Sequence, residues 1–489
     1  MKLNHLAFVG LLAAEALATN DITPDKVEAD IREDKLQSDL WNLLKIAKDN
    51  GGNRAFGLPG YNASLDFVLE RVATRFGKHF DTTVQRFTHL FTSTNKITLT
   101  GPDGSAVRVQ TLMYNNPTPE EGATGVLVAL PIDDERGSGC FADQWEGIDV
   151  TDKIALVKRG SCAIADKLRF AKNLGAKAVV LTNNVPGDSI TAATLSAENY
   201  GQIAPVGVIT YEQGAAWKTR VDAGEELTVT LLVDAIAEDR ESWNIISETK
   251  QGDPNNVIML GAHLDSVQEG PGINDDGSGT AALLQIAESF KQYSGIKNKV
   301  RFAWWGAEES GLVGSLYYGS QLSSDEADKI RFYYNYDMIG SKVPFYEVYA
   351  DTDAHKTGGN FLFDYLTSKG YPAEWGAFGS SSDYVAFIEL GIPSSGLFTG
   401  AGAPNDACYH LACDDLDNVN WEAITVNTKA AARAAAELAL SVEGIPPREK
   451  STTNPASKRG IARNLTKWAR LATGREKKHS CSGEDLSTV

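Results

Sequence analysis

Acidic residues and histidines follow directly after three apolar runs in the second half of the chain. NNVIMLGAHLD ends with His263 and Asp265, VRFAWWGAEE ends with Glu308 and Glu309, and RFYYNYD ends with Asp337. An unpaired carboxylate at the buried end of a strand is costly unless it is protonated, paired or bound to a metal ion. Because several such ends follow one another, the pattern predicts a metal centre where these strand ends meet.

The residue types suit two divalent cations that share one carboxylate. Two ions about 3.5 to 4 Å apart need a bridging carboxylate and about two further protein ligands each. In GINDDGSG, Asp276 or Ser278 is expected to cap the following helix, which leaves Asp275 free to bridge. Nitrogen and oxygen ligands without a thiolate favour zinc, although cobalt or manganese would also fit. The predicted ligands are His263 and Asp337 on one ion, Glu309 and His410 on the other, and Asp275 between the two.

Two further residues support this predicted site. Asp265 lies two residues after His263, on the same face of an extended chain, where it would orient the imidazole through its second ring nitrogen. Tyr409 precedes His410 and is a candidate to donate its hydroxyl to a developing oxyanion, the alternative being a packed aromatic ring. The other histidines after residue 18 lack acidic neighbours at metal-ligand spacing and are predicted to be structural or surface residues: His79, His89, His355 and His479.

The N-terminus has the features of a secretory signal peptide over residues 1–18: Lys2, an apolar run, and the triplet Ala-Leu-Ala that ends at Ala18. No later run reaches the roughly 18 to 20 apolar residues of a membrane span, so we expect an exported protein without a membrane anchor. The net charge of −18 argues against nucleic acid or an anionic membrane as the main partner. Asn62 and Asn464 lie in N-glycosylation sequons.

The chain has five cysteines, and export would allow four of them to form local disulfides, Cys140 with Cys162 and Cys408 with Cys413. Cys481 is then left over. The segment CYHLAC could instead hold zinc through thiolates around its histidine. In an exported protein we favour the disulfide, which would fix the loop that carries this histidine.

The apolar pattern divides the chain into three parts. Helical periodicity over residues 34–50 is followed by a second apolar-periodic helix and by short β-rich runs, TTVQRFTHLF, KITLT and AVRVQTLMY. Residues 119–235 contain compact apolar strands with short helices between them and are predicted to form an inserted unit. Strands and helices then alternate, so residues 19–118 and 236–445 together predict an α/β sandwich with a mostly parallel sheet. Residues 446–489 lose this periodicity and are predicted to form a flexible basic tail.

Five motifs in order, GAHLDSV, GINDDGSG, WWGAEESGLVGS, YNYDMIG and CYHLAC, resemble the two-zinc aminopeptidase family. The resemblance covers roughly residues 30 to 445. The segment KIALVKRGSCAIADKLRFAKNLGAKAVVLTN resembles the protease-associated domain, a small insertion in several secreted or vacuolar peptidases. The resemblance implies a three-layer zinc peptidase fold that contains this insertion. One departure is Ser382-Asp383-Tyr384, where relatives often have Ser-Asp-His, and because that residue is not a ligand we expect no loss of activity.

The resemblance also implies roles for individual residues. It assigns two zinc ions per chain to the five predicted ligands, makes Glu308 the general base, and makes Tyr409 a stabiliser of the transition state. Neighbouring residues at a strand end point in different directions, which agrees with different roles for Glu308 and Glu309.

The predicted function is the hydrolytic release of N-terminal residues from peptides and proteins by a secreted zinc aminopeptidase. Carboxylates around the metals favour a cationic α-amine in the substrate. A carboxypeptidase or dipeptidase would need a cationic pocket, but the ligand motifs contain no Arg or Lys. A receptor-like homologue without activity is the third alternative, against which the complete ligand set argues. A vacuolar destination remains the alternative to secretion, and a monomer is favoured.

Overall fold

The computed structural model describes residues 20–187 and 193–450. The predicted signal peptide, the sequon at Asn464, His479 and Cys481 lie outside these residues. The first five residues of the predicted tail lie inside them, and two of these, Arg448 and Lys450, bind the carboxylate of Asp328 at 2.6 Å each. No helix among the described residues combines the length and the apolar composition that a bilayer crossing requires.

The larger part of the molecule is built on a mixed sheet with the strand order β12-β11-β13-β10-β8-β9-β7. Strands β8, β9, β10 and β13 are parallel, whereas β11 and β7 run antiparallel to their neighbours β13 and β9. The predicted mostly parallel sheet is therefore confirmed. The strands are β7 (Thr228–Thr249), β8 (Asp253–His263), β9 (Asn298–Trp305), β10 (Ile330–Tyr336), β11 (Tyr346–Tyr349), β12 (Ala373–Gly376) and β13 (Ser394–Phe398).

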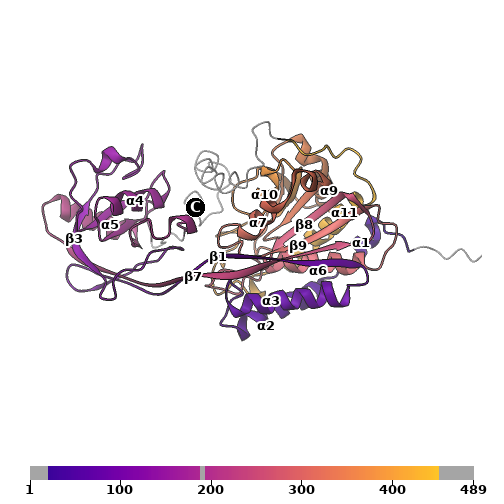
Figure 1. Ribbon diagram of the computed structural model, residues 1–489, viewed down its shortest axis with the longest axis horizontal. Coiled ribbons are helices and arrows are strands. Elements are labelled where there is room, and N and C mark those ends of the chain that lie inside the picture. Colours follow the sequence, from indigo (N-terminus) through magenta and orange to yellow (C-terminus); the bar gives the residue numbers. More distant parts are fainter. Residues whose placement is uncertain (1–19, 188–192, 451–489) are drawn as a thin grey trace, which may run out of the picture.

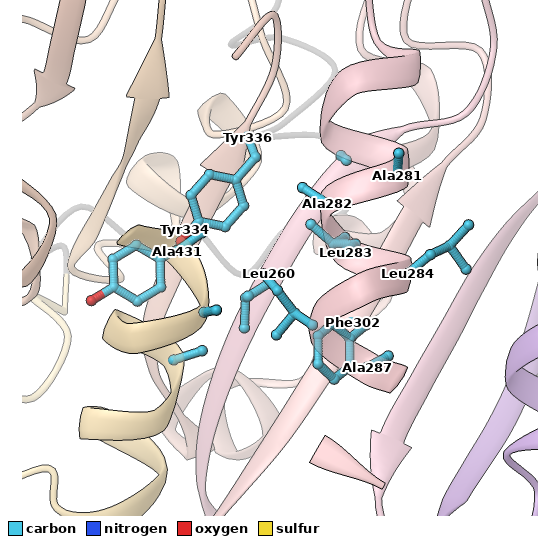
Figure 2. Close-up of a cluster of buried hydrophobic side chains, with 14 of the residues drawn as sticks. Leu260, Ala281, Ala282, Leu283, Leu284, Ala287, Phe302, Tyr334, Tyr336 and Ala431 are labelled. Carbon is cyan, nitrogen blue, oxygen red and sulfur yellow. The ribbon is translucent and has the colours of Figure 1, made fainter. Parts of the chain in front are cut away.

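Helices cover both faces of this sheet and make it the middle layer of a sandwich. Along β8, Ile258 and Leu260 point into one core and Met259 into the other, because successive side chains of a strand alternate between its faces. Figure 2 shows the first core, in which Leu260 packs among side chains of α6 and α11. This face carries α1 (Pro24–Asp30), α2 (Glu33–Asp49), α3 (Pro59–Leu69), α6 (Gly277–Phe290), α9 (Asp353–Ser368) and α11 (Trp421–Leu440). The other face carries α7 (Val313–Gln321) and α10 (Val385–Glu389), and α8 (Ser324–Lys329) leads into β10.

The predicted helices near the N-terminus form where expected. In α2 the leucines at 36, 40, 43 and 44 are buried on one side, and the helix ends before Gly51, whose φ of 91° favours glycine. The second helix, α3, continues into a π-helical turn, η1 (Glu70–Arg75).

The predicted β-rich runs after these helices are in β conformation, but two of them form one strand instead of two. TTVQRFTHLF and KITLT belong to one strand, β1 (Phe80–Thr100), which pairs antiparallel with β7 along its whole length. Of the polar residues TSTN between the runs, Thr92 to Thr94 pair in register with β7. Only Asn95 is left out, as a bulge, and the strand continues in the same direction. In the third run only Ala106 and Val107 form a strand, β2.

The β1/β7 ribbon leads to the inserted unit, which stands apart from the larger part in Figure 1. Its parallel strands follow the order β3-β4-β5-β6. Cys140 and Cys162 form the predicted disulfide there, with an S–S distance of 2.07 Å. The elements are β3 (Ala123–Ala129), β4 (Ile154–Lys158), β5 (Ala178–Thr182), β6 (Val206–Ile209), α4 (Ile164–Asn173), α5 (Tyr211–Asp222), and the short η2 (Ala142–Trp145) and η3 (Ala197–Asn199).

Candidate metal centre

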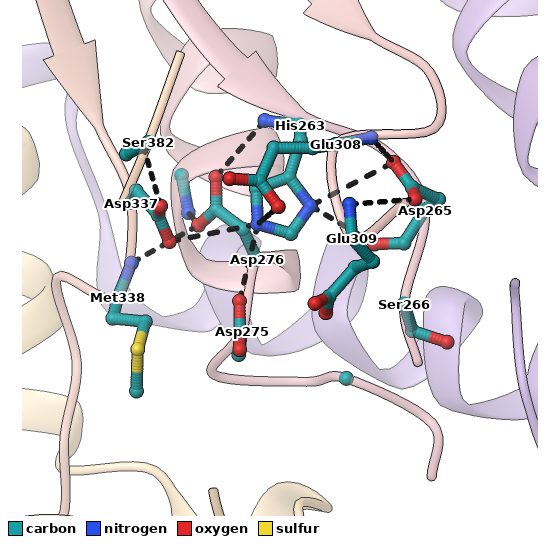
Figure 3. Close-up of polar contacts among 12 residues, drawn as sticks. His263, Asp265, Ser266, Asp275, Asp276, Glu308, Glu309, Asp337, Met338 and Ser382 are labelled. Carbon is teal, nitrogen blue, oxygen red and sulfur yellow. Dashed lines mark hydrogen bonds and ion pairs between the residues drawn. The ribbon is translucent and has the colours of Figure 1, made fainter. Parts of the chain in front are cut away.

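The polar strand ends lie together at one edge of the large sheet (Figure 3). Strands β8, β9 and β10 are parallel neighbours, so their carboxyl ends meet at this edge. They bring His263, the turn with Glu308 and Glu309, and Asp337 to one place. Helix α6 begins at the same edge, and the loop before it carries Asp275.

One carboxylate faces two imidazoles. Nε2 of His263 lies 3.1 Å from Oδ1 of Asp275, and Nε2 of His410 lies 3.0 Å from Oδ2 of the same residue. Asp275 is buried, at 5% exposure, so its two oxygens are directed at these rings and not at solvent.

Each imidazole has a second carboxylate beside it. Oδ1 of Asp337 lies 3.6 Å from Nε2 of His263, and Oε2 of Glu309 lies 3.1 Å from Nε2 of His410. Oδ1 of Asp337 and Oε1 of Glu309 are buried and accept no hydrogen bond from any described residue. Buried carboxylate oxygens normally have a partner, so both atoms point to a missing cation. Glu308 lies slightly farther out, with its Oε2 at 3.9 Å from Nε2 of His263.

The donor chemistry fits zinc. The atoms that converge are imidazole nitrogens and carboxylate oxygens, which zinc binds in proteins. His263, Asp275 and Glu309 offer donor atoms that all lie within 4.8 Å of one another. The thiolate alternative is excluded, because Cys408 and Cys413 form a disulfide with an S–S distance of 2.05 Å.

Asp276 also offers a donor atom within 4.8 Å of those of His263 and Asp337 but has another role. Its carboxylate accepts the backbone N–H groups of Gly279 at 2.7 Å, His263 at 3.2 Å and Met338 at 3.3 Å. It therefore caps α6, as one of the two predicted capping residues, and joins this helix to the ends of β8 and β10. With its oxygens used in this way, Asp276 is not a ligand candidate.

Asp265 supports the site by a different route from the predicted one. Its backbone oxygen, and not its carboxylate, lies at 3.1 Å from Nδ1 of His263, whereas the carboxylate is 3.8 Å away. The carboxylate instead accepts the backbone N–H groups of Glu308 at 3.0 Å and Glu309 at 3.3 Å. One residue thus orients the imidazole through its main chain and the glutamate turn through its side chain.

Burial and charge change the acidity of these groups. Burial raises the pKa of Glu308 well above its usual value and that of Glu309 to about 8. Burial alone would lower the pKa of His263, but the carboxylates of Glu308 and Asp337 outweigh it and raise this pKa. Asp275 is also buried, yet its hydrogen bonds to His263 and His410 hold its pKa below the usual value. Ligand groups must lose their protons to bind a cation, so metal binding at this site would release protons.

Three non-glycine residues at the site have left-handed backbones: Ala307 with φ of 58°, Met338 with 54° and His410 with 57°. Each is next to, or is itself, a candidate ligand or base. Such conformations cost energy outside glycine and persist where the surrounding structure holds them. Ala307 and Met338 turn the chain after the ends of β9 and β10, and His410 does so in the loop closed by Cys408 and Cys413.

Sequence reasoning missed a buried arginine behind the site. Arg54 is fully buried, and its guanidinium donates to the backbone oxygens of Pro271 at 2.9 Å, Gly272 at 2.6 Å and Leu264. It thereby fixes the segment between His263 and Asp275. A lone arginine outside any periodic pattern gave no signal of this role.

Two further positioning residues were also missed. The carboxylate of Asp414 accepts the backbone N–H groups of Asn274 at 2.9 Å and Asp275 at 3.1 Å. Ser382 donates its hydroxyl to Oδ2 of Asp337 at 2.7 Å. An acid directly after Cys413 was the available signal for the first, and the Ser-Asp pair was the signal for the second.

The remaining predicted residues are placed as follows. Tyr409 stacks on His410 with ring centroids 3.9 Å apart. Tyr384, the departure from the family pattern, is buried and accepts the backbone N–H of Gly379 at 3.2 Å. Asn62 is exposed on α3. His89 and His355, predicted to be structural or surface residues, bind the hydroxyl of Tyr114 and the backbone N–H of Asp351, respectively.

Comparisons with known proteins agree with this arrangement. Residues 244–435 match peptidase family M28, and residues 123–217 match the PA domain. Aminopeptidase Y of Saccharomyces cerevisiae is 34% identical over 88% of this chain and 82% of its own. The probable leucine aminopeptidase 2 of Aspergillus oryzae is 35% identical over 95% of this chain and 94% of its own. The chain belongs to peptidase family M28.

Solved structures of aminopeptidases are similar to this M28 chain in fold. An aminopeptidase from Aneurinibacillus covers 88% of the chain and 100% of its own, at 27% identity and a TM-score of 0.73. A zinc aminopeptidase from Bacillus subtilis covers 86% of the chain and 96% of its own, at 25% identity and a TM-score of 0.64. The three-layer zinc peptidase fold with an inserted PA domain, predicted from the sequence, is thus confirmed for this M28 peptidase.

Proposed function

We propose that this M28 peptidase is a zinc aminopeptidase that binds two ions and releases N-terminal residues from peptides and proteins. One observation carries the proposal: the two oxygens of Asp275 face His263 and His410, and each of these rings has its own second carboxylate. This is the arrangement that two cations sharing one carboxylate require. In it, His263 and Asp337 hold one ion and Glu309 and His410 the other.

Glu308 is the general base in this proposal. When bound, zinc supplies a Lewis acid and lowers the pKa of a water molecule. The carboxylate of Glu308 accepts a proton from the attacking water and delivers it to the leaving nitrogen as the C–N bond breaks. Burial raises the pKa of Glu308 well above its usual value, which makes its carboxylate a stronger proton acceptor than an exposed one. Asp265 holds the backbone of this residue, and Tyr409, beside His410, donates its hydroxyl to the developing oxyanion.

Charge favours an aminopeptidase over a carboxypeptidase. Four carboxylates surround the two imidazoles, so a substrate with a cationic α-amine suits the site better than one with a free carboxylate. The buried Arg54 is no counter-ion for a substrate, because its guanidinium already donates to three backbone oxygens. A receptor without activity would have no need for unpaired carboxylate oxygens directed into the centre.

We further propose that the protein is a secreted monomer, with the vacuole as the alternative destination. Two disulfides support passage through an oxidising compartment. We keep residues 19–118 and 236–445 as the peptidase domain and residues 119–235 as the insertion. Residues 123–217, which match the PA domain, lie inside the latter range.

A paired assay tests the proposed function. Leucine p-nitroanilide and its N-acetylated form are offered to the protein before and after treatment with a chelator, and zinc content is measured in parallel. We expect two zinc ions per chain and hydrolysis of the free-amine substrate alone. The chelator should remove the zinc and abolish hydrolysis, and added zinc should restore hydrolysis. Equal hydrolysis of the acetylated substrate, or activity without bound metal, would contradict the proposal.

A further inference from the structure

Two of the candidate ligands lie in loops that come from distant parts of the chain. Asp275 lies in the loop before α6, and His410 lies in the segment between β13 and α11, residues 399–420, called here the histidine loop. Nε2 of His410 is 3.0 Å from Oδ2 of Asp275. The two loops must therefore keep a fixed relative position if one cation is to lie between these side chains.

Asn274, directly before Asp275, has a buried side-chain amide that contacts two other segments of the site. Its nitrogen donates to Oδ2 of Asp406 in the histidine loop at 2.7 Å. Its oxygen accepts the backbone N–H of Gly340, three residues after Asp337, at 3.1 Å. A backbone N–H can only donate, which fixes the amide oxygen toward Gly340 and the amide nitrogen toward Asp406. Asn274 and Asp406 are both 0% exposed, so water does not compete for this contact.

The two carboxylate oxygens of Asp406 have separate tasks. Oδ1 accepts the side-chain amide of Asn418 at 2.8 Å and the backbone N–H of Cys408 at 3.1 Å. Both of these partners belong to the histidine loop itself. Oδ2 accepts from Asn274, across the gap to the other loop. One oxygen thus shapes the histidine loop, and the other joins that loop to the segment that carries Asp275.

His410 lies midway between two carboxylates that bind the same segment. Asp406 precedes it by four residues and accepts from the side chain of Asn274. Asp414 follows it by four residues and accepts the backbone N–H groups of Asn274 and Asp275 at 2.9 and 3.1 Å. The histidine loop is therefore held against Asp275 on both sides of its candidate ligand.

We propose that the hydrogen bond between Asn274 and Asp406 is a positioning contact that sets the affinity of the cation site of Glu309 and His410. The two residues act through the ligands beside them, because their own polar atoms are bonded to each other and to neighbouring protein groups. The inference rests on the two-ion site of the proposed function and names the contact that brings its two loops together.

Asp406→Asn changes this contact and spares the rest of the histidine loop. With the amide oxygen in the place of Oδ1, the new side chain still accepts from Asn418 and Cys408, but its N–H₂ group faces the N–H₂ group of Asn274. Turning the amide of Asn274 over removes that conflict but sets its N–H₂ group against the N–H of Gly340. Either orientation leaves a buried donor without an acceptor, which is costly.

The exchange Asn274→Asp/Asp406→Asn restores the contact with donor and acceptor reversed. The carboxylate at position 274 then accepts from the amide at position 406 and from the N–H of Gly340, and the net charge is that of the wild type. Asp417→Asn, at an exposed position of the histidine loop, is the matched control for the loss of one charge. Competition with a chelator measures the affinity of each zinc ion, and zinc per chain is measured in parallel.

We expect Asp406→Asn to bind one zinc ion as the wild type does and the other about 10- to 100-fold more weakly, as for other groups that orient metal ligands. Asn274→Asp alone sets two carboxylates face to face and should weaken the same ion, although it adds a negative charge near the metals. The exchange should recover most of the lost affinity, and Asp417→Asn should keep both affinities. A contact that only stabilised the fold would not act on one of the two ions.

Two wild-type zinc affinities in Asp406→Asn would overturn the proposal, as would an exchange variant that binds zinc no better than Asp406→Asn. Tighter zinc binding by Asn274→Asp would assign the effect to charge and would also overturn it. If Asp406→Asn fails to fold, the exchange variant decides, since it must fold and bind two zinc ions with nearly wild-type affinity. A wild-type protein that binds fewer than two zinc ions would contradict the proposed function itself, and this inference with it.

Discussion

The carboxylates of the site fall into two classes that differ in whether all their buried oxygens accept hydrogen bonds. Asp265 and Asp276 accept backbone N–H groups and hold the elements in place. Glu309 and Asp337 each keep a buried oxygen without a hydrogen bond from any described residue. Burial of such an oxygen is costly, so we propose that the second class binds the cations and that the cations stabilise the fold there.

Asp414 offers a test at the scale of one residue. Asp414→Asn replaces one of the two carboxylate oxygens by an N–H₂ group, which cannot accept a hydrogen bond. The side chain then no longer has a separate acceptor oxygen for each of the backbone N–H groups of Asn274 and Asp275. We expect zinc affinity to fall roughly 10- to 100-fold, as for other groups that orient metal ligands. Competition with a chelator measures it, and the exposed Asp417→Asn is the matched control. Unchanged zinc affinity in Asp414→Asn would contradict this positioning role.

His89 predicts a pH dependence of stability. Burial lowers its pKa to about 4, although Asp239 and Glu198 act in the opposite direction. The folded state thus disfavours the charged ring, so stability is full above the unfolded pKa of about 6.5 and is lost as the pH falls toward 4. The loss amounts to about 3 kcal/mol.

His89→Gln keeps an N–H donor for the hydroxyl of Tyr114 but cannot titrate. Urea unfolding at pH 7 and pH 4.5 should therefore show a smaller acid destabilisation in this variant than in the wild type. Equal losses of stability in the two proteins would show that His89 does not contribute.

Most of the candidate ligands could be predicted because their signal is local. His263, Glu309 and Asp337 follow apolar runs, where a buried charge needs an explanation. Arg54 and Asp414 could not be predicted, because their partners are backbone groups more than 130 positions away in the sequence. Only the folded chain brings these groups together.

At the scale of elements, the two disulfides should have different consequences. The Cys408–Cys413 pair closes a separation of 5 residues around His410, whose φ is positive, and the Cys140–Cys162 pair closes 22 residues in the inserted unit. Chain entropy assigns about 2 kcal/mol to the first and about 3 kcal/mol to the second.

We therefore expect the double variant Cys408→Ser/Cys413→Ser to lose zinc affinity and activity, because the loop no longer holds His410 in place. Cys140→Ser/Cys162→Ser should keep its zinc and lower only the stability of the inserted unit. Measurements of zinc content and thermal unfolding on both variants test these two expectations. Equal effects on zinc affinity would show that the small loop has no special role in holding the ligand.

Helices and strands with a clear pattern of apolar residues were predicted from the sequence. Elements whose conformation depends on residues far away in the sequence were not. Helix α2 follows its leucines, and β8, β9 and β10 follow their apolar runs. The joining of two runs into β1 was missed because pairing with β7, and not local preference, carries the strand past Asn95. The turn at Ala307 was hidden because an alanine in the left-handed region gives no glycine signal.

At the scale of the whole molecule, separate cores predict separate responses to metal. The cores of the inserted unit include Leu168 and Leu231 and do not include the residues that pack around β8. Zinc at 100 times its Kd adds about 2.7 kcal/mol per site to the part that binds it. Chelation should thus lower the melting transition of the peptidase part and leave that of the inserted unit in place. Equal shifts of all transitions would argue for one cooperative unit.

The division of roles between Glu308 and Glu309 is the central claim, and paired Gln variants test it most directly. Zinc content and kcat are measured for Glu308→Gln and Glu309→Gln under the same conditions. We expect Glu308→Gln to keep two zinc ions per chain while kcat falls by about 10²- to 10⁴-fold, the contribution of a general base. Glu309→Gln should bind less zinc. Retention of kcat within tenfold of the wild type by zinc-loaded Glu308→Gln would contradict the account.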